Sequence, residues 1–312
     1  MEQRLRHLIV ILSVSIALPT FTAFAKGEFW LFDIFTHFRV QMFAVCLLAA
    51  GFLLWRDRRW LSGFVAVAAI VNLVEIVAFY GAGGARADET VRAIRIISAN
   101  VNVQTNNAAR VAAFLKAEKP DVVIFLEASP RFVTEIEQAG ISFPHKRVVL
   151  GDDDFGVAVL SHLPLGNVRV DWFGGVRVPF LRADIETPSG LLHLAGVHAL
   201  SPVSAERTGI RNRQIRDLVD VLPDGGRRTL VVGDFNAAPW SHAFTAVREH
   251  SGLAFCPDSD GYFATWPAGI ALLHIPIDHC LHGEGVQIAR KWVGSDIGSD
   301  HYPIIVEAGL KD

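Results

Sequence analysis

The amino-acid sequence predicts an α/β domain that follows an apolar, helical N-terminal region. Of the 312 residues, 51% are hydrophobic and only 20% are charged. The apolar excess concentrates before residue 84, whereas the later residues have the mixed composition of a globular domain. From residue 94 onward, short β-branched runs alternate with segments of helical periodicity, which is the pattern of an α/β fold. We therefore predict a membrane region over residues 1–84 and one folded domain over residues 85–312.

Three apolar runs in the membrane region have about the length that a spanning helix requires. They cover residues 8–25, 40–55 and 61–80, and the second run is somewhat short. Aromatic residues near the ends of the runs are typical of the headgroup level of a bilayer: Trp30, Trp55, Trp60 and Tyr80. The sequence thus predicts three transmembrane helices.

The basic turn before the third run sets the predicted orientation. Arg56, Arg58 and Arg59 favour the cytoplasmic side, so the third helix leads the folded domain out of the cytoplasm. We expect an integral protein of the bacterial inner membrane with a periplasmic domain. The first run also fits a cleavable signal peptide, because a basic start precedes an apolar stretch that ends in Ala-Phe-Ala at 23–25. Both alternatives place the domain on the same side.

The elements of the domain follow from hydrophobic periodicity along the chain. Strands are predicted where short β-branched runs end at turn residues, at 94–101, 121–127, 146–150, 156–161, 191–198, 229–234 and 302–308. Helices are predicted where apolar residues recur every three or four positions, at 106–119, 129–138 and 203–222.

Polar residues recur where these predicted strands end. Asn100, Glu127 and His198 stand at the ends of three strands, and Asp234 and Asn236 at the end of a fourth. Strand ends on a rigid sheet are where functional sites are usually built. Carboxylate and amide oxygens without thiolates suit Mg²⁺ or Mn²⁺. The sequence therefore predicts a hard-cation site with acid–base partners.

The surrounding motifs resemble the endonuclease/exonuclease/phosphatase superfamily, which includes DNase I-like nucleases, abasic-site endonucleases, neutral sphingomyelinases and inositol polyphosphate phosphatases. The resemblance spans about Ile94 to Val306 and rests on SANVN, VIFLEAS, GVAVLS, GVHAL, GDFNAAP, PIDHCLH and GSDHYPI, in the order typical of that family. It implies a four-layer α/β sandwich, in which two packed mixed β-sheets are flanked by helices. It also implies metal-dependent hydrolysis of a phosphate ester.

The resemblance implies a role for each matching residue that would bind the metal ion or the phosphate. Asn100 and Glu127 would hold the ion, with Asp300 as a further ligand or a residue just behind the ligands. Asn236 would bind the phosphate. Some relatives carry an aspartate where this chain has Asn102, so a negative charge near the ion is missing.

The resemblance also implies the catalytic residues. Asp234 would align or deprotonate the attacking water. His301, polarised by Asp278, would face the scissile phosphate, and His198 would approach from the other side and protonate the leaving oxygen. Together these groups supply a positioned nucleophile and a proton donor, which hydrolysis of a phosphodiester requires in addition to charge neutralisation.

The charge of the predicted domain bears on its partners. Residues 85–312 contain 22 Lys and Arg against 27 Asp and Glu, a net charge of −5, so a strong basic footprint for nucleic acid is missing. The expected partners are the lipid bilayer and a phosphate ester, which is a nucleic acid, a lipid headgroup or a small phosphodiester; no defined protein partner is indicated. Arg182, Arg211 and Arg213 are candidates for phosphate contact, although a solvated helix face explains the last two equally well.

The predicted function is that of a membrane-anchored, divalent-metal-dependent phosphoesterase, nuclease-like or acting on a lipid or small phosphodiester. The alternative is a non-catalytic binding module that retains the fold. Cys256 and Cys280 would lie outside the cytoplasm and could form a disulfide, but their spacing does not show whether their Cα atoms come close enough.

Overall fold

The computed structural model describes residues 2–24, 29–81, 92–105, 107–150, 156–258 and 263–311. The chain divides into two compact units. The helical unit comprises Met1–Gly83 and Ala238–His242, and the sandwich unit comprises Gly84–Ala237 and Ala243–Asp312. Each unit is described below by itself.

The helical unit is built from α1 (Glu2–Thr22), α2 (Trp30–His37), α3 (Arg39–Trp55) and α4 (Arg59–Tyr80). Its core consists mainly of small residues, which let helices approach closely: Ala17, Cys46, Ala50, Leu53, Leu61, Val65, Ala68 and Ala69. A buried polar cluster accompanies this core. Asn72 accepts a hydrogen bond from Arg39 (3.3 Å) and donates one to Thr20 Oγ1 (2.7 Å). Asn72 and Thr20, polar residues of two of the apolar runs, are therefore paired inside the unit.

The helices differ in their capacity to cross a membrane. Among the described residues, only α4 is by itself long and apolar enough. Helices α2 and α3 meet the same criterion together, but a 78° bend separates them. The apolar part of α1, Arg6–Thr22, is shorter. The predicted runs at 8–25, 40–55 and 61–80 thus correspond mainly to α1, α3 and α4. Within the described part of the chain, α4 meets the length and composition of a span by itself, and α3 meets them only together with α2.

The segment Ala238–His242 clusters with the helices although it is distant from them in sequence. Ser241 Oγ donates a hydrogen bond to Asp33 Oδ1 in α2 (2.5 Å), and Trp240 Nε1 donates one to the carbonyl oxygen of Glu75 in α4 (3.1 Å). A segment from the middle of the predicted catalytic domain therefore belongs to the helical unit.

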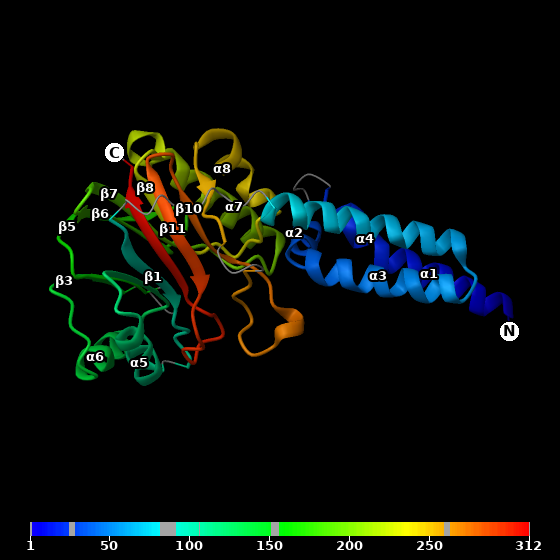
Figure 1. Ribbon diagram of the computed structural model, residues 1–312, viewed down its shortest axis with the longest axis horizontal. Coiled ribbons are helices and arrows are strands. Elements are labelled where there is room, and N and C mark those ends of the chain that lie inside the picture. Colours follow the sequence, from blue (N-terminus) through cyan, green and yellow to red (C-terminus); the bar gives the residue numbers. More distant parts are fainter. Residues whose placement is uncertain are drawn as a thin grey trace. The chain divides into compact units, whose positions relative to one another are not determined.

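Two six-stranded sheets form the sandwich unit (Figure 1). The first has the order β11 (Val286–Val293), β12 (Ile304–Leu310), β1 (Ile94–Asn100), β2 (Val122–Leu126), β4 (Val157–Ser161), β3 (His145–Val149). The second has the order β5 (Leu165–Trp172), β6 (Pro179–Thr187), β7 (Gly190–His198), β8 (Thr229–Asp234), β10 (Asp278–His282), β9 (Ala254–Phe255). Both sheets are mixed, because β1 runs parallel to β2 and β7 to β8, whereas the other pairs are antiparallel.

Helices cover the outer face of each sheet and complete the four layers. They are α5 (Ala108–Glu118) and α6 (Pro130–Gln138) on the first sheet, and α7 (Ala205–Asp220) and α8 (Thr245–His250) on the second. Asn107, Ser129 and Ser204 cap α5, α6 and α7, and each side-chain oxygen accepts a hydrogen bond from a backbone N–H of the first turn. The predicted four-layer α/β sandwich is confirmed.

Strand alternation places the polar strand ends between the two sheets. Residues of the central strands that pack beneath the helices include Ile97 in β1, Val197 in β7 and Val231 in β8. Asn100, His198 and Asp234 stand an odd number of residues from these positions, so they point to the opposite, inner face. The parallel pairs β1–β2 and β7–β8 therefore direct their last polar residues into the space between the sheets.

The structure contains five strands that the sequence does not predict: β5, β6, β9, β10 and β11. Bulges interrupt the alternation of two of them, because pairing shifts between Gly166 and Arg169 in β5 and between Ile288 and Arg290 in β11. Strand β11 also buries a charged residue, Lys291. An irregular period and a buried charge both hide a strand from pattern analysis.

Cys256 and Cys280 form a disulfide, which the sequence left open. Their Cα atoms are 5.3 Å apart, and the backbone N–H of Cys256 donates to the carbonyl oxygen of Cys280 (2.8 Å). The bond ties the residue after β9 to the middle of β10. Such bonds persist in oxidising compartments.

We expect iodoacetamide to add one group to the denatured, unreduced chain and three groups after reduction, because Cys46 is the free thiol. Intact-mass spectrometry measures the uptake. As a control, Cys256→Ala/Cys280→Ala should take up one group under both conditions. Uptake of three groups without reduction would show that the disulfide is absent.

Candidate active site

Side chains from both sheets meet at the carboxyl ends of the two parallel strand pairs. Asn100 ends β1, and Glu127 follows β2 in the first sheet. His198 ends β7 and Asp234 ends β8 in the second sheet, where the two residues are register partners. His198 Nε2 lies 3.5 Å from Glu127 Oε1 and 3.9 Å from Asp234 Oδ2. The two sheets thus contribute to one cluster.

Antiparallel neighbours bring Asp278 and His301 to the same place. Asp278 begins β10 directly opposite Asp234, and His301 precedes β12, which runs antiparallel to β1. His301 Nδ1 is 2.9 Å from Asp278 Oδ2, and its Nε2 is 3.7 Å from Asp234 Oδ2. Two hydroxyls fix the backbone, because Asp278 N donates to Thr265 Oγ1 and His301 N donates to Ser299 Oγ. The imidazole is therefore held between two carboxylates.

The Gly-Asp-Phe-Asn turn after β8 fixes the orientation of Asp234. Asn236 donates from its backbone N–H to Asp234 Oδ1 (2.8 Å) and from Nδ2 to Oδ2 (3.2 Å). Gly233 has a φ of +143°, and a Cβ there would stand 2.0 Å from the carbonyl oxygen of Val197. Only glycine therefore permits this approach of β8 to β7. Asn236 itself adopts a φ of +49°, which asparagine tolerates better than most residues.

Glu127 is the carboxylate best placed to bind a cation. It adopts a φ of +58°, an uncommon conformation for a residue other than glycine. Its Oε1 accepts a hydrogen bond from Asn100 Nδ2 (2.9 Å), and its Oε2 accepts one from the N–H of Val103 (3.3 Å). Asn100 Nδ2 also lies 3.4 Å from Asp234 Oδ2. Glu127, Asn100 and Asp234 thus surround one small polar space.

Asp300 is fully engaged by neighbouring side chains. Its Oδ1 accepts a hydrogen bond from Asn102 Nδ2 (2.7 Å) and its Oδ2 accepts one from Trp266 Nε1 (3.0 Å). Burial raises the pKa of Asp300, but the charge of His301 and these two hydrogen bonds hold it below the ordinary value. Asp300 is therefore an anion that is held by the side chains of Asn102 and Trp266.

Two overlapping sets of residues could hold a metal ion. Asp234, Asp278 and His301 each offer a ligand atom, and these atoms lie within 4.8 Å of one another. His301 is already engaged, however, because its Nδ1 lies 2.9 Å from Asp278 Oδ2. The oxygens around Glu127 fit a hard divalent cation better. Asn100 directs its Nδ2 toward Glu127 and Asp234, and its Oδ1 accepts a hydrogen bond from the N–H of Asn102 (3.1 Å), so ligation through the amide oxygen would require the amide to rotate.

The two histidines differ in protonation. Burial lowers the pKa of His301, but the carboxylates of Asp278 and Asp234 outweigh it and raise the pKa to about 10. Burial lowers the pKa of His198 to about 4, and the charge of His301 acts in the same direction. Burial and the charge of Asp278 raise the pKa of Asp234. At neutral pH these shifts favour a neutral His198 and a protonated His301.

The structure does not bring Arg182 to the cluster. Its guanidinium donates to both carboxylate oxygens of Asp171, at 2.5 and 3.0 Å, and to the carbonyl oxygen of Val221. These contacts engage its guanidinium away from the cluster, so the structure gives Arg182 no place among residues that could bind a phosphate there. Arg211 does not lie on a solvated helix face as one sequence interpretation held; it is fully buried and donates to the carbonyl oxygen of Asn236 (2.7 Å).

Several supporting residues are missing from the sequence-based set. Thr265, Trp266 and Ser299 fix Asp278, Asp300 and His301 through the hydrogen bonds described above. Ser299 stands inside the Gly-Ser-Asp-His motif, so its place in the motif was an available signal. Thr265 and Trp266 lie in a segment without helical or strand periodicity, so the sequence carried no signal for them.

Comparison with known families agrees with this geometry. Residues 97–301 match the Endonuclease/Exonuclease/phosphatase family. The chain belongs to this family. The activities in the family's name all hydrolyse phosphate esters, so the chain is a hydrolase of that class. A search of curated proteins found no match.

Solved structures share the fold of this family member over most of the sandwich unit. Humanized TDP2 of D. rerio matches with 19% identity and a TM-score of 0.59, over 70% of this chain and 99% of its own. Sphingomyelinase C from Streptomyces griseocarneus matches with 20% identity and a TM-score of 0.54, over 69% and 99%. Beta toxin from Staphylococcus aureus with bound magnesium ions matches with 19% identity and a TM-score of 0.53, over 70% and 100%.

We expect Asp278→Asn to lower the pKa of His301 by about 1–3 pH units, because it removes a carboxylate that favours the imidazolium. The folded-state pKa exceeds the ordinary 6.5, so this charge stabilises the fold fully below about pH 6.5 and ceases to do so as the pH approaches 10. ¹⁵N-histidine NMR of the metal-free full chain measures the titration. The exposed change Asp220→Asn should leave it unmoved, and a neutral His301 in the unmodified chain at pH 7 would contradict the assignment.

Proposed function

We propose that the chain is a membrane-anchored phosphodiesterase that depends on a divalent cation, Mg²⁺ or Mn²⁺. The observation that carries the proposal is the arrangement of an imidazolium, His301, between the carboxylates of Asp278 and Asp234 and beside the oxygen donors of Glu127. Nothing about the stability of the sheets requires these charges to be buried together, whereas hydrolysis of a phosphodiester uses each of them.

Asp234 is the proposed proton acceptor from the attacking water. Asn236 holds both carboxylate oxygens in place, so one orientation is fixed before substrate arrives. Burial raises the pKa of Asp234 toward the range in which a general base works well at neutral pH. The orientation and the raised pKa of Asp234 thus both suit it to accept a proton from water.

His301 is the proposed source of positive charge at the scissile phosphate. Asp278 binds Nδ1 and leaves the Nε2 side directed toward Asp234 and the interior of the site. An imidazolium in this position stabilises negative charge on the phosphate oxygens and can give its proton to the leaving oxygen. His198, neutral and beside Glu127, would donate a hydrogen bond to the phosphate, as would the amide of Asn236.

Glu127 and Asn100 are the proposed ligands of the divalent cation, with Asp300 held behind them by Asn102. A cation bound there would neutralise charge on a phosphate oxygen. The missing carboxylate at Asn102 reduces the negative charge around the ion, which favours moderate metal affinity. These residues therefore hold the ion that complements the positive charge of His301.

The substrate is proposed from charge and from the matched structures together. Those structures include TDP2 in complex with a single-strand DNA product and a sphingomyelinase C, so the fold serves both nucleic-acid and lipid phosphodiesters. The net charge of −5 over residues 85–312 disfavours an extended polyanion. A lipid headgroup or small phosphodiester is favoured for this chain.

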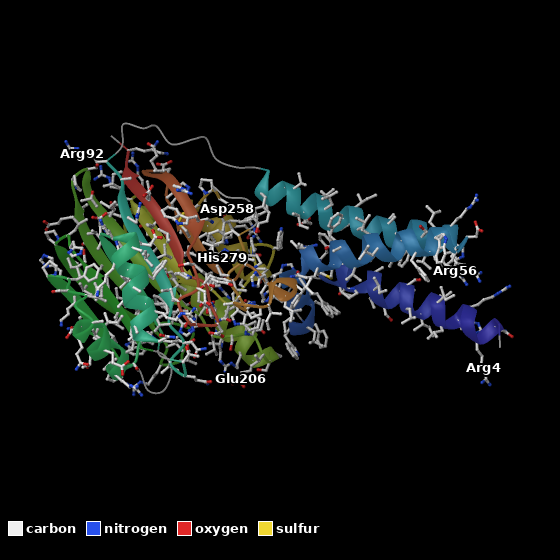
Figure 2. All side chains as sticks on the ribbon, turned by 60° about the horizontal axis from the view of Figure 1, so that its bottom comes forward. Arg4, Arg56, Arg92, Glu206, Asp258 and His279 are labelled. Carbon is white, nitrogen blue, oxygen red and sulfur yellow. A yellow bond between two sulfur atoms is a disulfide. The ribbon has the colours of Figure 1, made fainter. Side chains whose placement is uncertain are left out.

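Membrane anchoring is proposed from the surface of the helical unit. Large apolar side chains are exposed along its helices, among them Leu12, Leu48, Trp55, Trp60, Ile70 and Val74. Arg4 and Arg56 lie at the same end of this unit (Figure 2), which the positive-inside rule assigns to the cytoplasm. We propose spans at α1, α3 and α4 in a bacterial inner membrane, with residues 85–312 in the periplasm.

We expect His301→Ala and Asp234→Asn each to lower kcat by at least about a hundredfold with the fold retained. The full chain in detergent is assayed with Mg²⁺, Mn²⁺ or EDTA against plasmid DNA, RNA, bis-p-nitrophenyl phosphate and a choline phospholipid. His162→Ala and Asp220→Asn, both exposed positions, are matched controls that should keep full activity. Near-normal rates in both site variants would discredit the assignment, and no turnover of any substrate would favour a binding module.

A reporter fused after Asp312 tests the topology. Alkaline phosphatase should be active there and green fluorescent protein dark, because the first folds in the periplasm and the second in the cytoplasm. Fusions after residue 57, between α3 and α4, should give the reverse. Cytoplasmic behaviour of the Asp312 fusion would overturn the proposed orientation.

A further inference from the structure

A short apolar loop projects from the sandwich unit beyond the strand ends (orange in Figure 1). Residues 267–273, here called the apolar loop, read Pro-Ala-Gly-Ile-Ala-Leu-Leu and contain no polar side chain. Ile270 is 52% exposed, Leu272 86% and Leu273 49%. Three large apolar side chains within four positions are thus left in water, where each would gain stability by burial.

This cluster is unusual within the sandwich unit. Among the described residues of that unit, the other large apolar side chains with comparable exposure stand singly along the sequence: Leu150, Trp172, Leu191 and Val203. Scattered apolar residues are normal on a protein surface, whereas adjacent ones mark a contact surface. The apolar loop is therefore a candidate for a binding surface.

The base of the loop is closed by backbone hydrogen bonds. Trp266 and Ile275 form an antiparallel bridge in which each N–H donates to the carbonyl oxygen of the other. Within the loop, Leu273 N donates to the carbonyl oxygen of Ile270 (2.9 Å). The exposed side chains consequently sit on an ordered turn that is built to present them.

The loop is also attached to the segment that carries His301. Ala268 N donates to the carbonyl oxygen of Asp300 (2.7 Å), and Gly269 N donates to Tyr302 Oη (3.2 Å). These partners are the residues immediately before and after His301. Whatever holds the apolar loop therefore also positions the phosphate-facing imidazole.

We propose that the apolar loop inserts into the apolar layer of the bilayer, and that the site accordingly acts on phosphodiesters of membrane phospholipids. This inference rests on the proposed function and narrows its substrate class. The acyl chains of a lipid layer form no hydrogen bonds, so a surface without polar side chains can bind them. The headgroup phosphates lie just above the acyl region, so insertion of the loop would hold His301 near their level.

The proximity of a predicted membrane span along the chain makes the bilayer the expected binding partner of the apolar loop. Helix α4 has the length and composition of a membrane span, and residues 81–93 join its end to β1. A fully extended chain of that length reaches about 45 Å at most. A bilayer is thus always within reach of the sandwich unit, whereas a soluble partner would have to be found by diffusion.

Activity on two substrates tests the proposal. The full chain, one copy per lipid nanodisc, is assayed on a phospholipid of the disc and on water-soluble bis-p-nitrophenyl phosphate. Leu272→Ser/Leu273→Ser should lower kcat/KM for the phospholipid at least tenfold and keep the soluble substrate within twofold. Leu150→Ser, matched in residue type and exposure, should change neither. Equal rates on phospholipid, or equal losses on both substrates, would overturn the proposal.

A depth measurement separates this inference from the proposed function. Leu272→Cys, labelled with a fluorescent nitrobenzoxadiazole group, should be quenched by nitroxides on the acyl chains and protected from aqueous iodide. Absence of acyl-chain quenching would overturn the inference, whether iodide quenches the label in water or another protein or a second copy covers the loop. Acyl-chain quenching without turnover of any substrate would support membrane insertion of the loop and contradict the phosphodiesterase activity. Turnover together with iodide quenching would support the phosphodiesterase activity and contradict membrane insertion.

Discussion

The burial of several carboxylates in one small space is the constraint on which the site depends. Glu127, Asp234 and Asp278 lose most of their hydration between the two sheets, and burial raises the pKa values of Glu127 and Asp234. A buried charge without a partner is strongly unfavourable. The imidazolium of His301 offsets part of this cost, and a divalent cation beside Glu127 would offset more. The cluster is thus incomplete without further positive charge, and in that state it favours binding of a cation.

The two-sheet architecture holds these carboxylates together against their electrostatic repulsion. The strand ends come from β1, β2, β7 and β8, and every one of these strands is interior to its sheet. Backbone strain is accepted at the same place, because Glu127 and Asn236 have positive φ values. Rigid, paired strands can sustain such unfavourable local conformations where a mobile loop would relax. This is why the charged groups stand at strand ends and their supporting hydroxyls lie in the loops.

The sequence predicted those parts of the site that follow from periodicity and local motifs. Asn100, His198 and Asp234 end short apolar runs that were recognisable as strands, so their place at strand ends could be inferred. The failures share a different cause. Arg211 is buried because it binds a backbone carbonyl of Asn236, and Arg182 is occupied by Asp171. Such partners are distant in sequence and carry no pattern, so only the folded chain reveals them.

The protonation of the histidines was equally beyond the sequence. Motifs placed His198 and His301 on the same site, but their opposite pKa shifts arise from different surroundings. His301 has the carboxylate of Asp278 within hydrogen-bonding distance of its Nδ1, and Asp278 stands opposite Asp234 through the pairing of β10 with β8. A sequence specifies which residues meet, whereas the electrostatic outcome depends on which atoms face each other.

The helical unit contains more than the helices of the N-terminal region. Residues Ala238–His242 follow the Gly-Asp-Phe-Asn turn by one residue, yet they cluster with the helices. Ser241 binds Asp33 of α2, and Trp240 binds the backbone of Glu75 in α4. A simple tether would need no contribution from the middle of the catalytic sequence. The helices therefore complete the fold of a segment that begins just after Asn236, in addition to any role as an anchor.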